Sequence, residues 1–259
     1  MMINKKFNFS NHIYKEELYH DRYAPLLIKS STTDFIWVVQ EKIIFIKKYV
    51  KKGKKWYWLD LGCGPAENIK RNILPLMNDQ NIYVGVDISQ NLLNKARKNI
   101  FNGIFIKKPM GSLELPYEVF DYVSFFGALH HDEFPKDTLI KVSSFLKKGG
   151  YLFLREPTDI AMKKGYGLSP CEGGINSDEL RVWLKENNFK IIEWHFLNTK
   201  IFHFIRKILN KIKLRKWEDM EFFWKIKVRF EIIIEKLLEN KLLSLLKGTD
   251  MFIVARKLK

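Results

Sequence analysis

Two short segments combine glycine and carboxylate residues in a way that suits binding of a nucleoside. Asp60, Gly62 and Gly64 follow a short apolar run, and Asp87 ends the next apolar run along the chain. Glycines in such a turn let the backbone approach a ligand closely and adopt positive φ angles. A carboxylate at the end of the second strand can accept hydrogen bonds from both hydroxyls of a ribose. The pattern therefore predicts a nucleoside site at the carboxyl ends of two neighbouring strands.

Two adjacent histidines, His130 and His131, follow a third apolar run at residues 120–126. The unperturbed pKa of a histidine is about 6.5, so either side chain could take the proton of a hydroxyl nucleophile. The alternative is that one of them packs in the fold or contacts the bound ligand. Both histidines are therefore candidate catalytic residues.

Short apolar runs alternate with helical patterns, and this alternation indicates how these residues are positioned. Strands are expected at 56–61, 82–88, 104–107, 120–126, 151–155, 190–197 and 251–258, and helices at 35–53, 67–76, 91–98, 136–146 and 177–186. Gly149 and Gly150 are expected to form a turn before the strand at 151–155. The βαβ order predicts an α/β fold with a doubly wound, mostly parallel seven-stranded sheet and helices on both faces.

The chain is expected to divide into four parts. Residues 1–53 form an N-terminal helical lid and a first helix, residues 54–199 the sheet core, residues 200–248 a basic amphipathic helical insertion, and residues 249–259 the final strand. The insertion carries apolar residues on one helical face and Lys and Arg elsewhere. Three roles remain open for it: contact with an anionic membrane, a roof over the acceptor pocket, or a dimer interface.

Four motifs occur in order and at regular spacing: Asp60-x-Gly62-x-Gly64, Val84-Gly85-Val86-Asp87, Phe120-Asp121-Tyr122-Val123 and Leu146-Lys147-Lys148-Gly149-Gly150-Tyr151-Leu152. Together they resemble the successive motifs of class I S-adenosylmethionine-dependent methyltransferases, in the group that methylates small molecules, lipids and glycans and is termed type 11. The resemblance covers about residues 55–156. A nicotinamide-binding domain fits less well, because Gly62, Gly64 and Asn68 do not supply its third glycine at the required place.

The resemblance implies S-adenosylmethionine as the cofactor. The residues that it places at the cofactor are Asp60, Gly62, Cys63, Gly64, Asp87, Ile88, Met110, Gly111, Ser112, Phe126, Gly127 and Leu129, with Tyr14 and Tyr23 of the lid. Two positions depart from the family pattern. Ala66 stands where a third glycine is usual, and Gly111 stands where an acidic residue commonly binds the adenine amino group.

The resemblance also implies methyl transfer by in-line displacement, in which positioning supplies most of the acceleration. The expected acceptor is a hydroxyl or amine of a small molecule, glycan or lipid-linked compound. Nucleic acid is less expected, because 125–128 lacks the motif of base-amine methyltransferases and Pro170-Cys171 follows the fifth strand instead of the fourth. The alternatives are a non-catalytic S-adenosylmethionine-binding protein and a basic protein that uses the same fold to contact RNA or membrane.

Composition sets further expectations. The net charge of +16 favours anionic partners. The two cysteines, Cys63 and Cys171, offer neither a disulfide framework nor metal-ligand spacing, so we expect a reducing compartment and no metal. No run approaches the roughly 18 apolar residues that span a bilayer, and residues 1–10 do not resemble a signal peptide. A cytoplasmic protein is expected, with peripheral contact to the inner membrane face as an alternative.

Overall fold

The centre of the molecule is a seven-stranded sheet with the order β3-β2-β1-β4-β5-β7-β6. The computed structural model describes residues 3–33, 46–159, 173–197, 233 and 249–258. The strands are β1 (Tyr57–Leu61), β2 (Ile82–Asp87), β3 (Ile104–Lys107), β4 (Phe120–Phe126), β5 (Leu146–Pro157), β6 (Phe189–Leu197) and β7 (Asp250–Lys257). Neighbouring strands in the series β3, β2, β1, β4 and β5 pair in parallel, whereas β7 is antiparallel to β5 and β6. The predicted doubly wound, mostly parallel sheet is confirmed.

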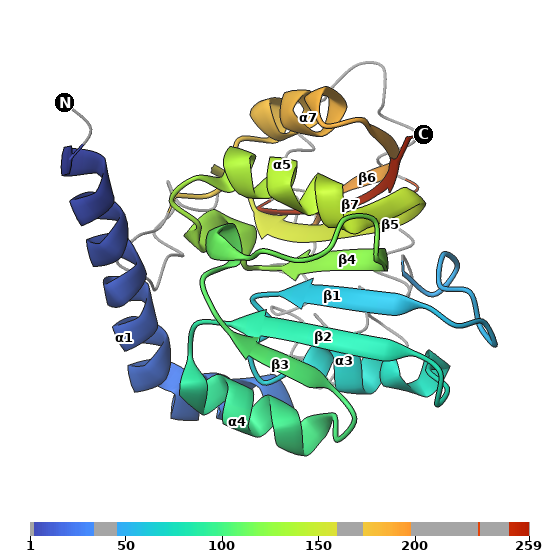
Figure 1. Ribbon diagram of the computed structural model, residues 1–259, viewed down its shortest axis with the longest axis horizontal. Helices are drawn as coiled ribbons and strands as arrows, with labels where there is room; N and C mark the ends of the chain where they lie inside the picture. The colour runs from blue at the N-terminus through green and yellow to red at the C-terminus, as the bar shows by residue number, and fades with distance from the viewer. Residues whose placement is uncertain (1–2, 34–45, 160–172, 198–232, 234–248, 259) are drawn as a thin grey trace, which may run out of the picture.

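Helices cover both faces of this sheet (Figure 1). The longer ones are α1 (Ile3–Thr33), α3 (Glu67–Asn72), α4 (Gln90–Asn99), α5 (Pro135–Phe145) and α7 (Ser177–Glu186), and the short 3-10 helices are η1 (Leu74–Leu76), η2 (Met110–Ser112) and η3 (Leu129–His131). Local sequence explains several ends. Ser89 and Asn176 accept hydrogen bonds from backbone amides in the first turns of α4 and α7. Pro75 has no amide hydrogen, so the helix expected at 67–76 continues after Asn72 only as η1.

Alternating side chains of the strands build two hydrophobic cores. In β1, Leu59 and Leu61 join the core that contains Leu139 of α5 and Leu180 of α7. Trp58 points to the opposite face and joins the core that contains the α3 side chain Ile69. Successive side chains of a strand point to opposite faces, so Asp60 lies on the same face as Trp58.

The prediction of a turn at Gly149-Gly150 is wrong. Both glycines lie inside the continuous strand β5, whose pairing with β4 shifts register between Phe120 and Tyr122. Gly149 has a φ of +77°, which places it in the left-handed region. The glycine pair therefore accommodates a bulge in the ladder, a role that sequence alone does not distinguish from a turn.

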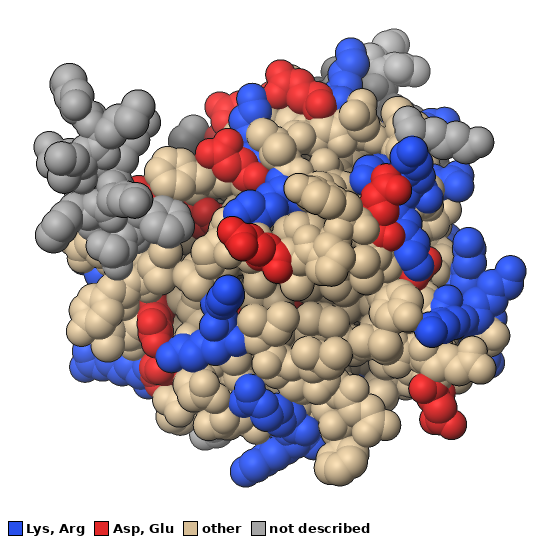
Figure 2. Space-filling model, viewed as in Figure 1, with Lys and Arg blue, Asp and Glu red and all other residues tan. Residues whose placement is uncertain are grey.

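Several predictions fall on parts of the chain outside the described residues. These are most of the helix expected at 35–53, Cys171, and almost all of the basic insertion at 200–248, whose three alternative roles stay predictions. Within the described ranges, no helix has the length and apolarity needed to cross a membrane. On the face shown in Figure 2, acidic side chains are interspersed among the basic ones.

Candidate active site

In the turn after β1, the backbone packs closely against its neighbours at Gly62 and borders open space at Gly64. Gly62 and Gly64 have φ angles of +67° and +53°. The Gly62 amide donates to the Val86 carbonyl at 2.8 Å, and a Cβ on Gly62 would lie 2.3 Å from the Cβ of Ala128. A Cβ on Gly64 would meet no heavy atom within 4 Å among the described residues. Gly62 is thus required for packing, and Gly64 leaves free space beside the turn.

Asp87 presents its carboxylate to the same turn from the end of β2. Oδ2 accepts a hydrogen bond from the Gly64 amide at 2.8 Å, and Oδ1 accepts one from the Ser89 amide at 2.9 Å. Burial raises the pKa of Asp87, and the two amide hydrogen bonds offset part of this effect. A carboxylate has about four lone-pair sites, so these two bonds leave acceptor capacity for a diol. Ile88, the next residue, is half-buried.

Asp60 lies in a buried polar network. Its Oδ2 accepts a hydrogen bond from the Tyr83 hydroxyl at 3.0 Å, and its Oδ1 accepts one from the Ser124 hydroxyl at 2.5 Å. Trp58 Nε1 in turn donates to the Ser124 oxygen at 2.8 Å. Asp60 therefore links β1 to β2 and to β4. Cys63, in the turn that follows, has a thiol whose pKa is raised by burial and by the nearby Asp87 and Asp60, so it is not set up as a nucleophile.

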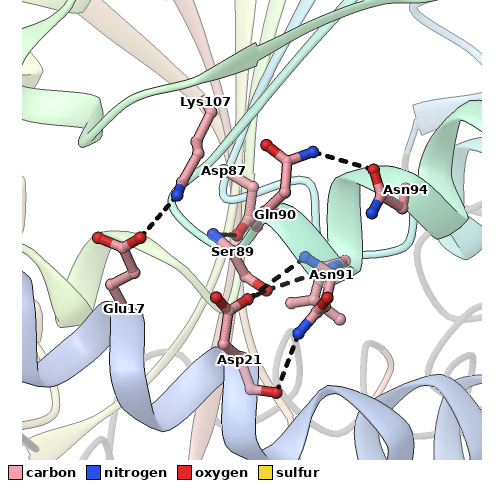
Figure 3. A network of polar contacts seen from close by, with 9 residues as sticks. Glu17, Asp21, Asp87, Ser89, Gln90, Asn91, Asn94 and Lys107 are labelled. Carbon is pink, nitrogen blue, oxygen red and sulfur yellow. Dashed lines mark hydrogen bonds and ion pairs between the residues drawn. The ribbon is translucent and has the colours of Figure 1, made fainter.

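The long helix α1 runs along the edge where β1, β2 and β4 end (Figure 1). Asp21 accepts hydrogen bonds from the Ser89 hydroxyl at 2.5 Å and from the Asn91 amide at 3.3 Å. Glu17 forms an ion pair of 2.6 Å with Lys107 (Figure 3). The helix thus docks directly beside Asp87, since Ser89 contacts both Asp87 and Asp21. The N-terminal helix is present as expected, and its function as a lid stays a proposal.

The two lid tyrosines are not placed alike. Tyr14 is 58% exposed and lies two residues before the buried Glu16, which is about 200° around the helix from it. Tyr14 therefore faces away from Glu16, and its contact with the cofactor stays a prediction. Tyr23 is 40% exposed and packs on Tyr19 with ring centroids 4.6 Å apart, on the same side of α1 as Glu16.

The residues of η2 lie next to the glycine turn that follows β1. A Cβ on Gly62 would lie 3.7 Å from Met110 Cε, so Met110 borders the turn. The Gly111 carbonyl accepts a hydrogen bond from Lys141 of α5 at 2.7 Å, and a Cβ on Gly111 would lie 3.0 Å from Thr138 Oγ1. Gly111 therefore packs closely against α5. Ser112 donates to the Pro109 carbonyl at 2.9 Å, which makes it part of the local turn.

His130 is held by a buried carboxylate that the sequence analysis did not identify. Glu156, at the end of β5, is fully buried, and its Oε2 lies 2.7 Å from His130 Nδ1. Its Oε1 accepts hydrogen bonds from the Ala128 and Leu129 amides. Burial raises the pKa of Glu156, but the contact with His130 and the amide hydrogen bonds lower it more, so the net shift is downward. An ionised Glu156 makes Nδ1 the donor and leaves the lone pair of His130 on Nε2.

The neighbouring residues have other roles. Burial lowers the pKa of His131, whose ring centroid lies 4.0 Å from that of His130. Gly127 has a φ of +75° and donates its amide to the Arg155 carbonyl at 2.6 Å. Leu129 is fully buried in the core, and its amide donates to Glu156. Phe126 packs against the other hydrophobic core, which contains Trp58 and Ile69.

The mostly parallel sheet with an antiparallel β7, the glycine turn after β1 and the buried carboxylate at the end of β2 fit a class I S-adenosylmethionine-dependent methyltransferase domain. A family model described as a methyltransferase domain matches residues 52–204, more than half of the chain. The chain belongs to this methyltransferase family, and S-adenosylmethionine is the cofactor of the class.

Relatives of known name agree with this class. Over 162 residues the chain is 26% identical to the mitochondrial ubiquinone biosynthesis O-methyltransferase of Candida albicans, covering 55% of this chain and 49% of that protein. A Haloferax volcanii putative methyltransferase, solved with its Trm112 activator, superposes with a TM-score of 0.64 at 14% identity over 95% of this chain and 97% of that one. A Haemonchus contortus phosphoethanolamine N-methyltransferase gives 0.59 at 16% identity over 93% and 59%. The chain spans about half or less of the length of its curated relatives.

The residues at the sheet edge fit S-adenosylmethionine. The open side of Gly64 provides room against the backbone, and the Asp87 carboxylate has the acceptor capacity that a ribose diol requires. Met110 offers an apolar surface next to the turn. Gly64, Asp87 and Met110 are therefore the residues that would hold the sugar and the base.

Proposed function

We propose that this protein transfers the methyl group of S-adenosylmethionine to a hydroxyl or amine of a small molecule, glycan or lipid-linked acceptor. The observation that carries this proposal is the pairing of His130 with the buried Glu156 beside the glycine turn. An oriented histidine at this edge suits removal of a proton from the acceptor.

His130 is the proposed general base. Its Nδ1 donates to Glu156. In this neutral tautomer Nε2 carries the lone pair that accepts the proton of the attacking group. Ionised Glu156 also stabilises the imidazolium that forms when this proton arrives, as a buried carboxylate does for a catalytic histidine. Bound S-adenosylmethionine supplies the electrophilic methyl group. Gly64 and Asp87 orient the cofactor, and α1 limits the access of water to the reacting groups.

The names of the relatives support a small acceptor. The matched yeast protein is an O-methyltransferase of ubiquinone biosynthesis, and the nematode neighbour was solved with phosphomonomethylethanolamine and S-adenosylhomocysteine. A base that removes a proton serves both a hydroxyl and an ammonium group, so the proposed site suits either acceptor. Contact of the insertion at 200–248 with a membrane is not needed for this chemistry.

Labelled cofactor tests the proposal. The purified protein is incubated with methyl-labelled S-adenosylmethionine and separate small-molecule, lipid, RNA and protein fractions of a cell extract. Label is expected in the small-molecule or lipid fraction, and the His130→Ala variant should transfer it far more slowly. Label only in RNA or protein would contradict the proposed acceptor class. Binding of S-adenosylmethionine without transfer to any fraction would favour the non-catalytic alternative.

A further inference from the structure

Three ligand-type side chains from two separate elements converge between α1 and the end of β4. They are Glu16 and His20 of α1 and His131 of η3, and one nitrogen or oxygen atom of each lies within 4.8 Å of the other two. Glu16 and His20 are four residues apart, which places them on one face of the helix. His131 is brought to them by the fold alone. We propose that these three side chains form a binding site for a divalent transition-metal cation of the zinc type.

The spacing of the atoms matches such a cation. Glu16 Oε2 lies 3.3 Å from His20 Nε2 and 3.3 Å from His131 Nδ1. A tetrahedral cation with metal–ligand bonds of about 2.0–2.1 Å has ligand atoms about 3.3–3.4 Å apart. Two of the three separations already equal this edge. One ligand atom of each residue lies within 4.8 Å of the other two, so the three side chains already surround one point.

Burial and bonding support the same ligand set. Glu16 is only 2% exposed, and the side chains of His20 and His131 are each 19% exposed. His131 Nδ1 is buried and makes no hydrogen bond of acceptable geometry to any described residue. Buried carboxylates are paired or coordinate metals, because an isolated buried charge is costly. A cation at this point would give the carboxylate and both imidazoles a common partner.

The ligand type restricts the cation. Two imidazole nitrogens and one carboxylate oxygen suit zinc, cobalt or iron(II) better than calcium or magnesium, which prefer oxygen ligands. Three protein ligands leave a fourth position for water or another small ligand. The site is also near the cofactor edge, since both His20 and His131 act electrostatically on Asp87.

The location suggests what the cation does. Two ligands belong to α1 and one to η3, so the cation would join the lid to the core. His12 of the same helix already contacts the His131 carbonyl at 2.9 Å. The cation is thus a clamp that stabilises the docked position of α1. This site does not depend on the proposed acceptor, because it is built from residues other than His130 and Glu156.

Cobalt(II) is a suitable probe, because tetrahedral cobalt(II) with nitrogen and oxygen ligands absorbs visible light. The full-length protein is stripped with a chelator and titrated with cobalt(II), followed by competition with zinc(II). We expect one cation per chain, with visible d–d bands and a rise in the melting temperature. Glu16→Gln, His20→Ala and His131→Ala should each weaken binding at least tenfold. Lys15→Ala, which changes an exposed residue of the same helix, should change it less than threefold.

Two results would overturn the site. One is a wild-type protein that shows neither the bands nor a thermal shift at equimolar cobalt(II). The other is cobalt affinity equal to wild type in the ligand variants, which would mean that Glu16 only hydrogen-bonds the two imidazoles. Each ligand is tested separately, so one unstable variant leaves two others. Binding of S-adenosylmethionine to the chelated protein is measured in parallel, which separates failure of the metal site from failure of the methyltransferase function.

Discussion

Glu156 lies near the end of β5 and His130 lies in η3, which follows the neighbouring strand β4, and their side chains meet at 2.7 Å. The register of the two strands explains the contact: Phe126 pairs with Arg155, so the residues that follow each of them emerge at the same edge of the sheet. The same carboxylate accepts the amides of Ala128 and Leu129. One buried residue thus fixes both the backbone of the turn after β4 and the orientation of the proposed base.

The variant His130→Ala should lower the rate of methyl transfer by about 10² to 10⁴ and leave cofactor affinity unchanged, because loss of a general base affects the chemical step. Single-turnover transfer to the labelled acceptor fraction measures the rate, and calorimetry measures the affinity. His195→Ala, on β6, is the control. A His130→Ala protein with the wild-type rate would mean that proximity alone drives transfer.

The variant Asp21→Ala should loosen the docking of α1, because it removes the hydrogen bonds to Ser89 and Asn91. Each such bond contributes about 1 kcal/mol, so the loss of both should lower cofactor affinity by up to about thirtyfold if α1 closes over the cofactor. Hydrogen exchange of residues 12–24 should become faster. The exposed Lys15→Ala serves as control. Unchanged exchange and affinity in Asp21→Ala would show that α1 does not depend on this contact.

Ala66 occupies the left-handed region, with a φ of 55°, where the family usually has glycine. Ala66→Gly should be close to neutral in stability. Relief of about 1–2 kcal/mol of backbone strain offsets about 0.8 kcal/mol of lost methyl burial and about 0.4–1 kcal/mol of unfolded-state entropy. Ala96→Gly, at a buried site inside α4, has no strain to relieve and should lose about 1 kcal/mol or more. Equal losses of unfolding free energy in urea would argue against strain at Ala66.

Glu193 on β6 should make stability depend on acid pH. Burial raises its pKa, but the contacts with His195, Lys48 and Tyr49 lower it further, to about 2 from an ordinary 4.5. A lowered carboxyl pKa stabilises the fold above pH 4.5, and this contribution is lost as the pH falls from 4.5 towards 2. Glu193→Gln should therefore destabilise the protein at pH 7 and progressively less below pH 4.5. Urea unfolding from pH 7 to pH 3 measures this.

The control for that series is Glu186→Gln. Glu186 forms a half-exposed ion pair with Lys136, and such surface pairs contribute little. A Glu193→Gln effect that is the same at pH 7 and pH 3, or no larger than that of Glu186→Gln, would contradict the pKa shift.

Local sequence patterns were sufficient to predict the sheet and the positions of Asp87, Gly62 and Gly64 at the ends of its strands. Asp87 and the two turn glycines follow apolar runs directly, so their place at strand ends depends only on nearby residues. The length of β5 could not be predicted in this way. A glycine pair such as Gly149-Gly150 favours a turn and a bulge equally, and only the pairing with β4 decides between them.

Contacts between distant parts of the chain could not be predicted. Glu156 meets His130 only because β5 lies next to β4, and Glu16 meets His131 only because α1 docks along the strand ends. The spacing rules for metal ligands consider residues close in sequence, so they pointed to no metal. The i, i+4 pair of Glu16 and His20 was the one local signal that could have suggested this site.

Calorimetric titration with S-adenosylmethionine and S-adenosylhomocysteine, on wild type and Asp87→Ala, tests the central claim most directly. Asp87 is expected to accept two charge-assisted hydrogen bonds from the ribose, each contributing about 1.5–3 kcal/mol. Wild type should bind both compounds, and Asp87→Ala should bind them at least tenfold more weakly at unchanged fold, whereas the exposed Asp79→Ala should match wild type. No binding by the wild type, or equal affinity in Asp87→Ala, would contradict the account.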